Sequence, residues 1–201
     1  MTITAKLKET ILLYHQDRIA SDKAGYFATE EHFRLRRERA EAEQNNRSWL
    51  EILAKIRQSL PDYAVRDFTN LADNSCYEGE ILLHQNMSFL DDDVELLTLL
   101  KGRRLTLRLL VSVLGPFYFF LIEEQRYNPA DDKHSFKIIE AETPEHQRIL
   151  QEVKQIVERY CYSFLKRSTL KEVVPKLTTE FQGQGSVTVF HCLFSDLMNF
   201  Y

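Results

Sequence analysis

His191 and Cys192 are neighbours in the segment VFHCLFSD. An imidazolium near a thiol can turn the thiol into a nucleophile by lowering its pKa. The tail that contains them begins with a strand pattern, and neighbouring residues of a strand point to opposite faces. We therefore interpret Cys192 first as a small buried apolar residue, the usual role of a free cysteine. Cys161 lies on an apolar helical stripe, and we expect it in the core for the same reason.

The remaining histidines, cysteines and acidic residues do not form a known metal or catalytic pattern. No HxxxH, HExxH or CxxC spacing occurs among the six histidines and three cysteines. The run of three aspartates lacks the glycine and the spaced ligands of a calcium loop. The sequence therefore predicts no catalytic residue, no metal and no cofactor.

Charged residues are concentrated in two short runs. The segment RLRRER contains Arg34, Arg36 and Arg37, which could form a patch for phosphate groups or an acidic partner. Glutamates alternate with these arginines, and that alternation favours a salt-bridged, solvent-exposed helix face. The acidic run is a candidate surface for a basic partner and consists of Asp91, Asp92 and Asp93.

Composition restricts the class of protein. The 201 residues are 44% hydrophobic and 28% charged, which is typical of a globular protein that folds without a disulfide or a metal. The formal charge of -4 argues weakly against a general nucleic-acid binder. An odd number of dispersed cysteines and an N-terminal sequence without a signal-peptide core predict a reducing, cytoplasmic location.

The most apolar stretch, LRLLVSVLGPFYFFLIEE, spans residues 107–124. A membrane helix needs about 20 predominantly apolar residues, and this run is interrupted by Arg108 and by Gly115-Pro116. Alternation of apolar and polar residues from residue 103 onward instead predicts a strand. We therefore expect no membrane association.

Three strands are predicted between residues 103 and 142 as an antiparallel meander, and CYEGEILLHQ adds a fourth. Gly115-Pro116 is either a turn between two strands or a bulge in one long bent strand. In the second strand, Phe117 and Phe119 should point to one face of the sheet, and Tyr118 and Phe120 to the other. Both faces are then apolar, so each is covered or forms a pocket or an interface.

Helices are predicted on both sides of these strands. Apolar spacing indicates one helix over residues 4–20 and a second over residues 29–60, with a weak point at residues 44–49. Thr143 as N-cap, followed by Pro144, begins a third helix that we expect to reach Arg167. A short helix capped by the aspartates is expected near residue 93, and the tail after residue 186 begins as a strand.

Together these patterns predict one α+β domain over residues 1–201. Residues 1–62 would form an N-terminal helical hairpin. Residues 76–201 would form an antiparallel sheet of about four or five strands, packed by the long helix of the C-terminal half.

Three functions remain open. The first is a non-enzymatic protein-interaction module of the bacterial immunity, adaptor or assembly-factor type, with a protein partner and a hairpin that could support a homodimer. The second is a small-molecule binder or enzyme with its pocket between the sheet and the third helix, for which the candidate residues are Tyr118, Tyr160, His191 and Cys192. The third, which the charge disfavours, is nucleic-acid binding through the arginine-rich helix.

Overall fold

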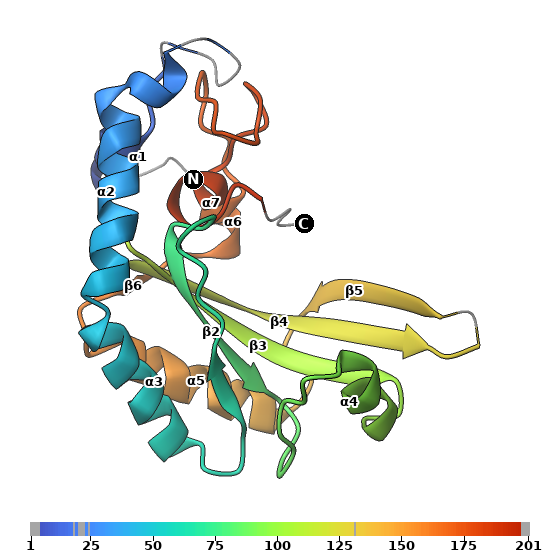
Figure 1. Cartoon of the computed structure of the whole chain (residues 1–201). Coiled ribbons are helices and arrows are strands. Elements are labelled where there is room, and N and C mark those ends of the chain that lie inside the picture. Colours follow the sequence, from blue (N-terminus) through green and yellow to red (C-terminus); the bar gives the residue numbers. More distant parts are fainter. Residues whose placement is uncertain (1–4, 18, 20–22, 24, 131, 198–201) are drawn as a thin grey trace.

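An antiparallel sheet forms the centre of the protein (Figure 1). The computed structural model describes residues 5–17, 19, 23, 25–130 and 132–197. Five strands neighbour one another in chain order, and a short parallel strand, β6 (Ser163–Phe164), also pairs with β4. The five are β1 (Val65–Asp67), β2 (Cys76–Leu82), β3 (Arg103–Ser112), β4 (Phe117–Asn128) and β5 (Lys133–Ile139). The α+β class and the antiparallel sheet are confirmed.

The apolar stretch forms two strands, with Gly115-Pro116 in the connection between β3 and β4. The alternative of a single bent strand is therefore wrong. Within the described part of the chain, no helix has the length and apolar character needed to cross a membrane.

Capping residues fix where several helices begin. The Thr29 side chain accepts a hydrogen bond from the backbone N–H of His32, and Thr143 accepts one from His146. The chain is interrupted at residues 45–46, inside the predicted weak point, so the second helical region is two helices. The longer helices are α1 (Ala5–Tyr14), α2 (Glu30–Gln44), α3 (Arg47–Ser59) and α5 (Pro144–Glu158); the shorter ones are η1 (Tyr26–Ala28), α4 (Asp93–Leu99), α6 (Arg167–Leu170) and α7 (Val189–Leu193).

One face of the sheet packs against α3 and α5. The odd-numbered apolar residues of β3 lie on this face, as their alternation predicts. Trp49 of α3 stacks on Tyr77 of β2, with ring centroids 5.4 Å apart and planes 8° apart. Gly79 of β2 lies beneath the same helix. A Cβ atom added at this position would come within 3.0 Å of both Trp49 and Leu53. The close approach of α3 to β2 therefore depends on a residue without a side chain.

The opposite face is apolar at one end and charged in the middle. At the apolar end, Phe117 and Phe119 pack in a core with residues of α1, α6 and α7. Tyr118 belongs to the core on the other face, so the predicted alternation is confirmed and both faces are covered here. In the middle, Arg108 donates to Glu78 at 2.6 Å and to Glu123 at 3.2 Å.

Helix α5 ends at Glu158, so the predicted end at Arg167 is wrong. Cys161 adopts the left-handed conformation, with φ of 65°, which turns the chain out of the helix. Ser163 and Phe164 then pair with β4 as β6. Cys161 is exposed, which also contradicts its expected place in the core.

The predicted strand in the tail is a helix from residue 189. Thr188 and His191 cap α7 reciprocally, and this local pairing begins the helix immediately after a single β-bridge at Thr188. Helix α1 ends at Tyr14, earlier than predicted. Residues 4, 18 and 20, within the predicted helix, lie outside the described residues.

Candidate functional site

Two of the predicted ligand-binding residues lie on opposite faces of the sheet. Tyr118 is fully buried beside α3 and α5, and its hydroxyl donates to Glu158 at 3.3 Å. Cys192 is fully buried in the other core, where burial raises the pKa of its thiol. The sheet therefore separates these two side chains.

His191 and Cys192 take part in structural hydrogen bonds. His191 Nδ1 accepts the Thr188 backbone N–H at 3.0 Å, which helps to cap α7. The carbonyl of Cys192 accepts from Nε2 of the buried His15 at 2.8 Å. Burial lowers the pKa of His15 to about 4, so this histidine is neutral near pH 7. Both contacts fix the position of α7.

The arginine-rich helix does not present its guanidinium groups as one patch. Arg34 donates to the carbonyl of Leu13 at 2.8 Å, and Arg37 pairs with Glu41 at 3.6 Å. Arg36 lines a cleft of about 480 Å³ between α2, η1 and two loops. The three guanidinium groups therefore have different neighbours and do not form one binding patch.

The aspartate run lies at the start of α4. Asp92 caps the helix by accepting the N–H groups of Val94 and Glu95. Asp93 pairs with the buried Arg104 of β3 at 2.6 Å, which ties α4 to the sheet. Only Asp91 has neither role.

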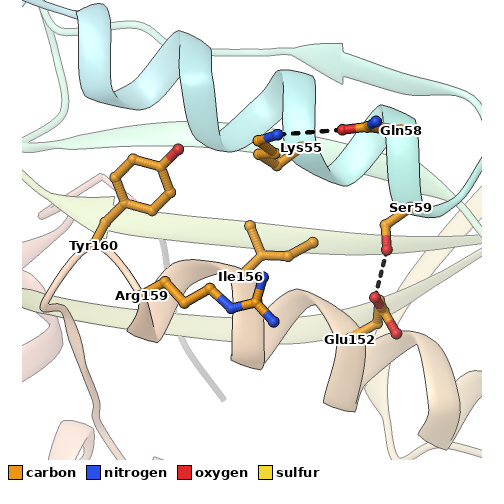
Figure 2. Close-up of a pocket in the computed structure, with 7 residues that line it drawn as sticks. All are labelled: Lys55, Gln58, Ser59, Glu152, Ile156, Arg159 and Tyr160. Carbon is orange, nitrogen blue, oxygen red and sulfur yellow. Dashed lines mark hydrogen bonds between the residues drawn. The ribbon is translucent and has the colours of Figure 1, made fainter.

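Tyr160 lies in a groove between α3 and α5, shown in Figure 2. The volume is about 470 Å³, within the range of about 300 to 1,000 Å³ found for small-molecule sites. A hydrogen bond from Ser59 to Glu152 joins the two helices at one end of the groove. Polar groups of both helices surround Ile156, and the remaining lining residues are Lys55, Gln58 and Arg159.

A second candidate site is the part of the β4–β5 hairpin that projects away from α1 and α2 in Figure 1. We call residues 123–130 and 132–138 the arm. Residues 133–137 of β5 are all exposed, and Phe136 is 60% exposed. In the described chain, β5 pairs with β4 alone, so its other edge is open.

A buried carboxylate organises the cations at the base of the arm. Glu124 is only 1% exposed and contacts Arg103, Arg126 and Lys137, one from each of β3, β4 and β5. The hydrogen bond from Arg126, together with Lys137 and Arg103, lowers the pKa of Glu124 to about 2. One anion thus holds three cations on one face of the arm.

Sequence reasoning missed this cluster. The one indication in the sequence is that Glu124 and Arg126 are two residues apart in a predicted strand, which places both side chains on one face. Their partners Arg103 and Lys137 lie on other strands, so the cluster becomes visible only once the register is known.

Comparison with known proteins gives no relative: no protein-family model, no curated protein and no solved structure shows significant similarity to this chain.

Proposed function

We propose that this protein is a non-enzymatic protein-interaction module that binds an extended, acidic segment of a partner protein along β5. The observation that carries the proposal is the open edge of β5 on a projecting, exposed arm. A strand at a sheet edge offers a row of unpaired N–H and C=O groups, and strand addition is a common way to bind peptides.

The direction of these groups follows from the sheet. The carbonyl of Tyr118 accepts the N–H of Leu165, which directly follows β6. Since β3 pairs along one edge of β4, β5 and β6 lie along the other edge. The backbone N–H and C=O groups of the even-numbered residues of β4 therefore point toward β5. Because the pairing is regular, the odd-numbered residues of β5 bond to β4. His134, Phe136 and Ile138 therefore direct their backbone N–H and C=O groups outward.

Charge favours an acidic partner. Arg126 and Lys137 are more than half exposed on one face of the arm. Three cations, Arg103, Arg126 and Lys137, share the two carboxylates of Glu124 and Glu142, so this cluster keeps an excess of positive charge. A second copy of β5 would bring like charges together, whereas an aspartate or glutamate opposite Lys137 would complement it.

The test uses a random peptide library selected on the purified chain. We expect the selected peptides to be acidic and to protect the amides of residues 134–138 from hydrogen exchange. Phe136→Pro should weaken binding by about tenfold or more, because it removes an outward N–H without removing a bond to β4.

Phe136→Ala is the matched control, since it removes the same side chain and keeps the N–H. If the proline and alanine variants bind the peptides equally, or if protection falls elsewhere in the chain, strand addition at β5 is refuted. A thermal melt of both variants confirms that each is folded.

We place this binding activity in the bacterial cytoplasm as part of the same proposal, in a protein of the adaptor, assembly-factor or immunity type. Three cysteines without a disulfide support a reducing compartment.

A further inference from the structure

We infer that the groove between α3 and α5 binds a small organic anion, with its carboxylate or phosphate head at Lys55 and Arg159 and its apolar part over Ile156. This site is separate from the arm, so the inference does not depend on the proposed function.

The two cations of the groove are available for a ligand. Lys55 donates to the neutral Gln58 at 3.3 Å, which leaves two of its three N–H groups. In the described structure, no carboxylate lies within ion-pair distance of Lys55 or Arg159. The one acidic lining residue, Glu152, already accepts the hydroxyl of Ser59. The groove therefore has a surplus of positive charge.

The cations belong to opposite walls. Lys55 extends from α3, whereas Arg159 follows the last turn of α5, and Figure 2 shows both beside Ile156. A guanidinium can bind a carboxylate or phosphate through two parallel hydrogen bonds, and an ammonium adds a third donor. Tyr160 follows Arg159 and also lines the groove, and its hydroxyl is a further donor.

Ile156, which lies between Lys55 and Arg159, indicates that the ligand has an apolar part. Ile156 lines the groove, is 6% exposed and belongs to the core beneath, so the groove lies over the apolar core between the two helices. The Ser59–Glu152 hydrogen bond closes one end. An elongated ligand with one charged end and a short hydrocarbon chain fits this arrangement better than a bare inorganic anion.

The test is an NMR titration of the full chain with four probes. Hexanoate and hexyl phosphate carry both features, whereas 1-hexanol lacks the charge and inorganic phosphate lacks the chain. We expect the two amphiphilic anions to shift the amides of Lys55, Ile156 and Tyr160, and to bind about tenfold or more tightly than the other two. The tighter of the two anions identifies the head group.

Variants separate specific binding from general charge attraction. Arg159→Gln and Lys55→Gln should each weaken the better anion by about tenfold. Arg47→Gln, on the same helix as Lys55 but paired with Glu51 outside the groove, should leave binding unchanged. The inference is overturned if hexanol binds as tightly as the anions, if neither groove variant weakens binding, or if no groove amide shifts.

Discussion

Arg103 and Glu124 form the closest contact at the base of the arm, where the Nε of Arg103 donates to Oε1 of Glu124 at 2.5 Å. Arg126 reaches the same oxygen at 3.1 Å, and Lys137 reaches the other oxygen at 2.9 Å. The buried carboxylate therefore links three strands through their side chains.

Replacing Glu124 by glutamine should destabilise the protein by about 1.5 to 3 kcal/mol near neutral pH, because hydrogen bonds to a charged group are lost. The folded pKa of about 2 lies below the usual value of 4.5, so the stabilising effect is present above pH 4.5 and is lost as the pH falls toward 2. Urea unfolding of both proteins across this range measures it.

Glu142→Gln is the control for this variant. Glu142 also pairs with Arg103, at 2.6 Å, but it is exposed to solvent. The Glu142→Gln substitution should lower the free energy of unfolding by less than about 1 kcal/mol. An equal loss of stability in the two variants would contradict the central role of Glu124.

Arg108→Met tests the charged middle of the sheet. It leaves Glu78, which is 2% exposed, without its hydrogen-bonded partner, and such a loss typically costs about 3 to 5 kcal/mol. Burial already raises the pKa of Glu78, although Arg108 opposes this effect. Without Arg108 the folded pKa rises further, so the folded variant takes up a proton more readily than the unfolded chain.

The loss of stability in Arg108→Met should therefore be largest at about pH 8 and smaller at about pH 5, where Glu78 can be neutral. Denaturant unfolding at both pH values measures the difference. Arg47→Met, at an exposed ion pair, should change stability little at either pH. A loss for Arg108→Met that grows as the pH falls would show that Glu78 is not the group left unpaired.

Gly79→Ala should destabilise the protein by about 1 to 3 kcal/mol through overpacking against α3. The new Cβ would come within 3.0 Å of Trp49 and Leu53. Gly183→Ala is the matched control, because no atom lies within 4 Å of its added Cβ. Thermal unfolding compares the two, and equal melting temperatures would mean that α3 can move away from β2.

The three cysteines should differ in reactivity. Cys76 and Cys192 are fully buried, and burial raises the pKa of both thiols, whereas Cys161 is exposed. A disulfide reagent should therefore modify one thiol quickly in the native protein and all three after unfolding. Cys161→Ser should abolish the fast reaction; if a fast reaction persists in this variant, one of the buried thiols is accessible.

Local patterns predicted most of the strands and helix starts. Alternation from residue 103 identified β3 and the two faces of β4, and Thr143-Pro144 marked the start of α5. The end of α5 could not be predicted, because Cys161 takes a left-handed conformation that glycine usually provides. The apolar spacing continues past that point by coincidence, since the partly buried Phe164 belongs to the strand β6 and not to a helix.

The candidate sites were harder to predict, because they depend on contacts between distant segments. Tyr160 was among the predicted residues, but its groove partner Lys55 lies on a helix that was assigned to a separate hairpin. Likewise, β5 was expected as a strand, but its exposed edge follows from strand order, which alternation alone does not give.

The parallel strand β6 has a consequence for how the chain folds. β3, β4 and β5 are joined by short turns, whereas β6 reaches β4 only after α5 has crossed the sheet. When two segments so far apart in sequence pair, the chain loses loop-closure entropy before the new contacts stabilise it. We therefore expect the hairpins to form early, and the segment after Cys161 to dock in a late, slow step.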